Sequence, residues 1–146
     1  MRTILPALIF TTLATASCGD SQSPEAQVKG VIGAMEAAAE ARDVGDLMEH
    51  VSSEYRDAYG QGPDEASRYV RGYFIANQQI HLLTRVDAVE FPSDREARAT
   101  VLVGMVSRDA DTAAAWSLAA DLYEFDLALV REDGDWKVTY AEWRRK

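Results

Sequence analysis

The stretch LALVREDGDWKVTY, residues 127–140, predicts two β-strands joined by a tight turn. Apolar and polar residues alternate on both sides of Glu132-Asp133-Gly134-Asp135, and Asp-Gly between alternating segments is a strong hairpin signal. We expect the first strand to run from Leu118 to Arg131 and the second from Trp136 to Trp143. Each strand should then have one apolar side, formed by Tyr123, Phe125, Leu127 and Leu129 in the first and by Trp136, Val138 and Tyr140 in the second.

Two more strands are predicted upstream of this hairpin. Residues 80–91 are rich in β-branched side chains, and residues 96–107 alternate, with Ala97, Ala99, Val101, Val103 and Met105 on one side. Pro92-Ser93-Asp94 forms a turn between them. Because consecutive strands joined by short turns pair with each other, we expect a four-stranded antiparallel meander.

The first half of the chain is predicted to be helical. A helix begins at Ser23-Pro24-Glu25, which supplies a cap and a proline in the first turn, and ends at Ala41. A shorter helix follows Asp43, with Val44, Leu47, Met48 and Val51 as its apolar stripe. A third helix starts at Pro63 or Asp64. Residues 52–59 are expected to form irregular turns. Three N-terminal helices packed on one face of a sheet make the predicted class α+β.

The N-terminal segment has the layout of an export signal. A basic start, an apolar run from Ile4 to Ala14 and small residues up to Ser17 indicate a signal peptide over residues 1–17. Ala16-Ser17-Cys18 resembles a bacterial lipobox, which implies that Cys18 is lipidated and becomes the first mature residue. By the same resemblance, Gly19 favours the outer membrane, with the domain facing the periplasm. Residues 18–24 would then be the lipidated cysteine and a short tether; the alternative is an ordinary signal peptide with an incidental cysteine.

Charge and cysteine content exclude several classes of function. The formal net charge of -9 argues against nucleic acid, because phosphate binding needs a basic patch. One cysteine cannot form an internal disulfide or a thiolate zinc site, and His50 and His81 lie too far apart for a metal-binding motif. Asp109, Asp111 and Asp121 lack the spacing of a calcium loop. We therefore expect neither a metal nor a cofactor.

Four segments carry a likeness to a known family: Val28–Asp43, Tyr55-Arg56-Asp57, Gly72-Tyr73-Phe74 and Arg131–Val138. In the last, a strand ends in charged residues, turns at glycine and restarts with tryptophan and lysine. On these segments the chain resembles the nuclear-transport-factor-2-like superfamily, also called SnoaL-like, over residues 25–143. The resemblance implies a domain over residues 25–146 in which a curved sheet wraps around the helices and forms a cone with an apolar pocket. The family includes isomerases, cyclases, dehydratases and non-catalytic binding domains, so the fold does not decide the function.

The resemblance also suggests site residues. A family isomerase would need an acidic base in an apolar pocket and a donor for the oxyanion. Asp57 is the candidate base, and Tyr55 and Tyr73 are the candidate donors. The ligand-binding candidates are Tyr55, Tyr69, Tyr73, Phe74, His81, Tyr123, Phe125 and Trp136. Each has a structural alternative: the aromatic side chains can be core, and Asp57 beside Arg56 can be an ion pair or a turn residue.

Three functional hypotheses follow. The first is a membrane-anchored envelope lipoprotein that binds a small apolar ligand or a protein partner without catalysis. The second is a cofactor-independent isomerase or dehydratase with Asp57 as base. The third is a homodimer formed through the outer sheet face, as in many family members, which would require that face to be apolar.

Overall fold

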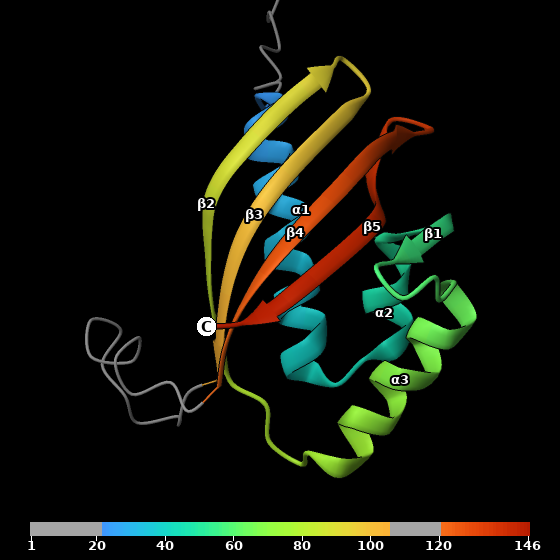
Figure 1. Ribbon diagram of the computed structural model, residues 1–146, viewed down its shortest axis with the longest axis vertical. Coiled ribbons are helices and arrows are strands. Elements are labelled where there is room, and N and C mark those ends of the chain that lie inside the picture. The colour runs from blue at the N-terminus through green and yellow to red at the C-terminus, as the bar shows by residue number, and fades with distance from the viewer. Residues whose placement is uncertain (1–21, 106–120) are drawn as a thin grey trace, which may run out of the picture.

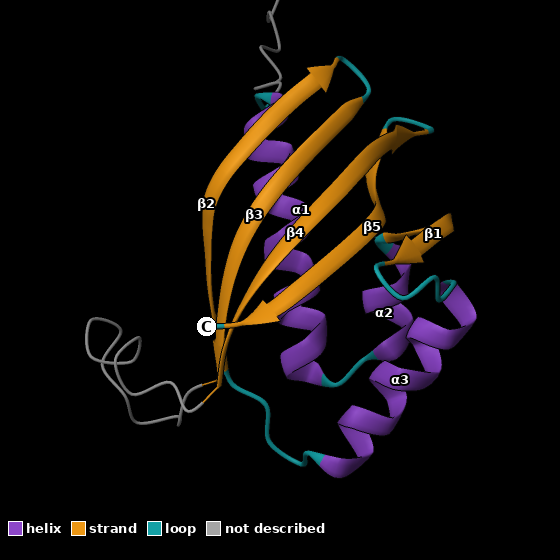
Figure 2. Ribbon diagram, in the orientation of Figure 1, coloured by secondary structure: helices purple, strands orange, loops and turns teal. Residues whose placement is uncertain are grey.

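The computed structural model describes residues 22–105 and 121–146. These residues form three helices and five strands in the order α1 (Pro24–Ala41), α2 (Val44–Glu49), β1 (Val51–Asp57), α3 (Pro63–Ala76), β2 (Leu82–Ser93), β3 (Glu96–Met105), β4 (Asp121–Glu132) and β5 (Asp135–Arg145). The strands make one curved sheet in the order β1-β5-β4-β3-β2, with α1 lying along one of its faces (Figure 1). Figure 2 shows how the helices gather on that side of the sheet. The predicted α+β class is confirmed.

The sheet has one more strand than the sequence predicted. β2, β3, β4 and β5 form the expected antiparallel meander, but β1 adds to β5 in parallel, so the sheet is mixed. Residues 52–57 were expected to be irregular turns. A bulge between Val51 and Arg56 breaks the alternation of β1, so Ser52, Tyr55 and Asp57 are its buried residues. That spacing hides the period of two by which a strand is recognised.

The first helix begins as its sequence predicts. The Ser23 hydroxyl accepts a hydrogen bond from the Ala26 N–H at 3.2 Å, and Pro24 occupies the first turn. Val28 and Ile32 are buried against the sheet. We call the sheet face that α1 covers the inner face. The core on this face includes Ala97, Ala99, Val101, Leu129, Trp136, Val138 and Ala141.

A bulge in β5 corrects the predicted faces of the last strand. Leu129 pairs with Val138, but Ala128 pairs with Tyr140, which leaves Thr139 as an extra residue. Trp136 and Val138 lie on the inner face as predicted. The prediction that Tyr140 shares their side is wrong, because the extra residue moves Tyr140 to the opposite, outer face.

Several predictions lie outside the described residues. They concern the signal peptide over residues 1–17, Cys18 and most of its tether, and Leu118 at the expected start of β4. Asp109 and Asp111 are also outside. Within residues 22–105 and 121–146, no helix is long and apolar enough to cross a membrane.

Candidate functional site

Burial of the inner face decreases from one end of the sheet to the other. At the end that carries the β2–β3 and β4–β5 turns, here called the hairpin end, Leu129 and Val138 are 1% and 2% exposed. At the opposite end, where β3 ends and β4 begins, Val103 and Tyr123 are only partly buried. We call this opposite end the distal end. In the part of the chain that the structure describes, the inner face is therefore filled at the hairpin end and partly uncovered at the distal end.

Aromatic side chains continue this partly uncovered surface across β4 and β5. The Phe125 ring stacks on the Trp143 ring with centroids 6.0 Å apart. The Tyr59 ring meets the Trp143 ring edge-on, with centroids 5.7 Å apart. Phe125 and Trp143 are half-buried and Tyr59 is exposed. The distal half of the inner face thus offers flat apolar surface of the kind that holds small apolar molecules.

Two carboxyl groups of α1 point at β2 near the distal end. The Glu36 side chain is hydrogen-bonded to the Thr84 side chain. Burial raises the pKa of Glu36, the Thr84 hydrogen bond opposes this shift, and the nearby charge of Glu40 adds to it. Glu40 accepts a hydrogen bond from the Leu82 N–H at 2.8 Å. Glu36 is therefore a partly desolvated carboxyl that retains its proton to higher pH than usual.

A tyrosine hydroxyl from α3 reaches the same end of the inner face. Tyr73 donates a hydrogen bond to the Met105 sulfur. Burial raises the pKa of Tyr73, and the nearby Asp121 and Tyr123 raise it further. Because Thr84 pairs with Val103, and Met105 lies two residues further along β3, the polar groups of Glu36 and Tyr73 meet the sheet about 7 Å apart along the strand. A carboxyl and a phenol can together orient the polar part of a ligand.

The structure brings only some of the predicted ligand residues to the distal end. Tyr73, Tyr123 and Phe125 gather there. Trp136 lies at the hairpin end, where its Nε1–H donates to Gln27 Oε1 at 3.2 Å and the Arg131 guanidinium covers its ring at 4.9 Å. It is 3% exposed. Trp136 is therefore a core residue at the closed end.

The remaining ligand candidates are dispersed. Phe74 is buried in the core, and its carbonyl accepts a hydrogen bond from Arg42. Tyr69 is 65% exposed on α3. His81 precedes β2, and its Nε2 is buried with no hydrogen-bond partner in the part of the chain that the structure describes. Of these three, Phe74 is a core residue and Tyr69 is mostly in solvent, whereas His81 lies beside Leu82, which pairs with Met105 at the distal end.

Asp57 and Tyr55, the catalytic candidates on β1, have structural roles. Asp57 is buried, and its Oδ1 accepts hydrogen bonds from the Tyr59 N–H at 2.9 Å and the Gln61 N–H at 2.8 Å. The carboxylate thereby shapes the loop between β1 and α3. Tyr55 is buried next to it, and burial first, then the charge of Asp57, raise the pKa of Tyr55 to about 12. Tyr55 consequently stays protonated near neutral pH and is a weaker acid than an ordinary phenol.

Sequence reasoning missed Glu36, Thr84 and Trp143. The sequence pattern assigned Glu36 no role, although it follows the buried Ile32 by four residues and so shares its side of the helix. That spacing was the available signal. Trp143 carried no such signal, because strict alternation from Trp136 assigns it to the outer face and only the bulge at Thr139 returns it to the inner one.

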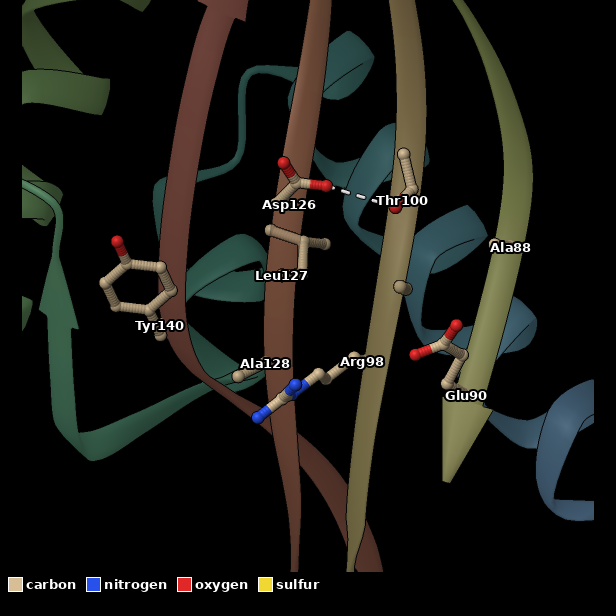
Figure 3. A pocket seen from close by; sticks show the side chains of 9 residues that line it. Ala88, Glu90, Arg98, Thr100, Asp126, Leu127, Ala128 and Tyr140 are labelled. Atoms are coloured by element: carbon tan, nitrogen blue, oxygen red, sulfur yellow. Dashed lines mark hydrogen bonds between the residues drawn. The ribbon is translucent and has the colours of Figure 1, made fainter. Parts of the chain in front are cut away.

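The outer face of the sheet carries charged side chains. A hollow of about 400 Å³ lies there, and Figure 3 labels residues that line it, among them Ala88, Glu90, Arg98, Asp126, Ala128 and Tyr140. Next to it, Arg144 pairs with Asp126 at 2.9 Å and with Glu124. The apolar outer face that the homodimer hypothesis requires is not found among the described strand residues. Nor do three or more His, Cys, Asp or Glu side chains gather anywhere in residues 22–105 and 121–146 as a metal site would need.

Solved structures share this architecture. A domain with a cystatin-like fold from Nostoc punctiforme superposes with a TM-score of 0.67 at 16% identity, over 84% of this chain and 76% of that one. A provisionally assigned scytalone dehydratase from Novosphingobium aromaticivorans gives 0.65 at 14% identity, over 84% and 83%. An NTF-2-like protein of unknown function from Silicibacter pomeroyi gives 0.61 at 12% identity, over 84% and 95%.

The similarity is one of structure. No protein-family model and no curated protein sequence matches the chain. Identities this low establish the fold and leave the activity open. The chain therefore has the nuclear-transport-factor-2-like fold, as its sequence resemblance predicted.

Proposed function

We propose that this protein is a lipid-anchored bacterial envelope protein whose domain binds a small, mainly apolar ligand without catalysis. The observation that carries the proposal is the burial gradient of the inner face. Its hairpin half is packed, with Trp136 and Val138 buried, whereas Phe125, Tyr123 and Trp143 keep part of their surface uncovered. Leaving aromatic rings uncovered costs hydrophobic stabilisation, which a ligand covering them would restore.

The polar groups at the distal end define what such a ligand carries. Glu36 with its raised pKa can donate or accept a hydrogen bond. Tyr73 supplies a hydroxyl whose hydrogen bond among the described residues goes to a weak acceptor, the Met105 sulfur. A neutral molecule with an apolar body and one hydroxyl or carbonyl group would fit both features. The net charge of -9 disfavours an anionic ligand.

Anchoring rests on the N-terminal sequence. The apolar run before Cys18, the small residues at positions 15–17 and the cysteine at the expected cleavage point favour acylation of Cys18. Gly19 favours the outer membrane, with the domain in the periplasm. Stable anchoring takes more than one acyl chain, which bacterial lipoproteins of this pattern carry.

The alternative is a cofactor-independent isomerase or dehydratase. Asp57 is the base that the sequence suggested, but both backbone N–H groups of its loop already occupy its Oδ1. If the protein is an enzyme, Glu36 is the better base, because burial raises its pKa toward the range in which a carboxylate accepts protons near neutral pH. One structure of similar fold is described as a scytalone dehydratase, which supports testing this alternative.

The binding proposal is tested with Nile red as an apolar probe. The Phe125→Ala variant should bind the dye several-fold more weakly than the wild type, because it removes half of the stacked pair with Trp143. Phe91→Ala is the matched control, since Phe91 packs on Trp136 at the hairpin end and is 39% exposed. Equal binding by the wild type and Phe125→Ala, or loss only in Phe91→Ala, contradicts the assigned place.

Native mass spectrometry of protein extracted from membranes tests the anchor and the natural ligand together. The expected result is a mature chain starting at Cys18 with added acyl mass and a bound small molecule. An unmodified Cys18 in secreted protein would contradict the anchoring. Turnover of the retained molecule by the wild type but not by Glu36→Gln would contradict the proposal of binding without catalysis and support the enzyme alternative.

A further inference from the structure

The point at which the tether joins the domain is fixed at the hairpin end. Gln22 is held by its carbonyl, which accepts a hydrogen bond from Gln27 Nε2 at 2.9 Å. Gln27 in turn accepts hydrogen bonds from Trp136 Nε1 and from Arg131 at the β4–β5 hairpin. The start of α1 therefore lies beside the two hairpin turns (Figure 1). In the sequence, residues 19–21 are all that lies between Cys18 and this attachment.

The tether before the attachment is much shorter than helix α1 after it. Four residue steps from Cys18 to Gln22 span at most about 14 Å. Helix α1 has 18 residues and is about 27 Å long. It runs from the hairpin end to the distal end, where Glu36 and Glu40 meet β2. If the domain were inverted, the attachment would stand about 27 Å above the bilayer, beyond the reach of the tether.

We propose that the domain stands on the envelope membrane with its hairpin end toward the bilayer and its distal end toward the aqueous phase. This inference rests on the proposed acylation of Cys18. It assigns the hairpin end as the surface next to the lipid headgroups. The aromatic surface around Phe125 and Trp143 then faces away, so its ligand arrives from the aqueous side and not out of the membrane.

The tether holds the hairpin end close to the bilayer, and the charge of its turns keeps them from inserting. The turns carry exposed Asp94, Asp133 and Asp135, and residues 93–95 and 133–135 contain no large apolar side chain. Acidic turns do not enter the acyl region, and they are repelled by anionic headgroups.

The test uses site-specific fluorophores on the acylated full-length protein in vesicles of phosphatidylethanolamine and phosphatidylglycerol. Acylation consumes the only native thiol, so Asp94→Cys and Gln78→Cys each introduce the one reactive thiol. Asp94 lies in the β2–β3 turn and Gln78 lies in the segment between α3 and β2 at the distal end, and both are exposed. A nitroxide-headgroup lipid should quench the label at Asp94→Cys several-fold more than the label at Gln78→Cys.

The outcomes separate the orientation from the anchoring. Equal quenching, stronger quenching at Gln78→Cys, or none at either position in vesicle-bound protein overturns the orientation. Failure of the protein to float with the vesicles contradicts the anchoring and hence the proposed function. Inserting a long Gly-Ser linker after Ser21 should bring the two quenching values together, because the domain can then rotate.

Discussion

Replacing Gln27 by methionine should destabilise the domain through the indole of Trp136. The Gln27 Oε1 atom accepts a hydrogen bond from Trp136 Nε1 at 3.2 Å, and Trp136 is 3% exposed. Methionine has a similar length but offers only a weak acceptor, so the indole N–H would stay buried without a good partner. Arg131 loses the same acceptor.

The size of the effect follows from the unsatisfied donor. A buried donor left without its partner costs about 1–3 kcal/mol of stability. In the Trp136→Phe background no indole donor remains, so Gln27→Met should cost about 1 kcal/mol less there. The loss of the Arg131 contact is common to both backgrounds and largely cancels in the comparison. The double-mutant cycle thus isolates the Trp136–Gln27 pair.

Urea unfolding of the non-acylated mature chain, followed by far-ultraviolet circular dichroism, measures the four stabilities of the cycle. Gln79→Met is the matched control, because Gln79 is exposed and its substitution should change stability by less than about 0.5 kcal/mol. A coupling within about 0.3 kcal/mol of zero would refute the reasoning, since distant, independent sites add to that accuracy. A loss in Gln79→Met as large as in Gln27→Met would refute it as well.

Substitutions at three further positions probe the distal end, the β1–α3 loop and the turn between β4 and β5. Burial raises the pKa of Glu36 above its ordinary value of 4.5, so the stability tied to its proton is fully present below that pH and is lost as the pH rises through the folded pKa. Glu36→Gln should therefore gain stability over the wild type between about pH 4 and pH 7, as measured by urea midpoints, and a pH-independent difference would contradict this. Asp57→Ala should lose about 1–3 kcal/mol because two backbone N–H groups lose their acceptor, while Asp57→Asn keeps the oxygen and should lose less; similar losses would argue against the loop role. Gly134 has φ of 91°, so Gly134→Ala should raise the unfolding rate and cost about 1 kcal/mol, and an unchanged chevron plot would count against the turn assignment.

Much of the fold could be predicted because local signals agreed with the tertiary structure. Ser23 and Pro24 mark the start of α1 in both, and Asp133-Gly134 joins β4 to β5 with positive φ at both residues. β1 could not be predicted, because its pairing partner, β5, lies some 80 residues later in the chain and its own alternation is broken by a bulge. Sequence periodicity reports local regularity and says nothing about a parallel edge strand held by a distant one.

The candidate site was harder to predict than the fold. Aromatic residues are chosen by type alone in a sequence, so Trp136 and Phe125 looked equivalent until the structure placed them at opposite ends of the inner face. Glu36 was overlooked because a glutamate on a helix is usually solvent-exposed. Its partner Thr84 lies on β2, 48 positions later, and only the packing of α1 on that strand brings the two together.

Helix α1 connects the anchor to the candidate site. Its first turn is fixed to the β4–β5 hairpin through Gln27, and Glu36 in its later half reaches the distal end. The 13 residue steps from Ser23 to Glu36 rise about 20 Å. With Cys18 acylated as proposed, the five steps from Cys18 to Ser23 add at most about 18 Å, so the polar groups of the site stand no more than about 38 Å above the bilayer surface. Tether length therefore sets the height of the site above the bilayer. The hydrogen bonds of Gln27 with Gln22, Arg131 and Trp136, here called the Gln27 cluster, set the direction in which the site faces. A chain with an intact tether and a disrupted cluster should keep its anchor and lose its orientation.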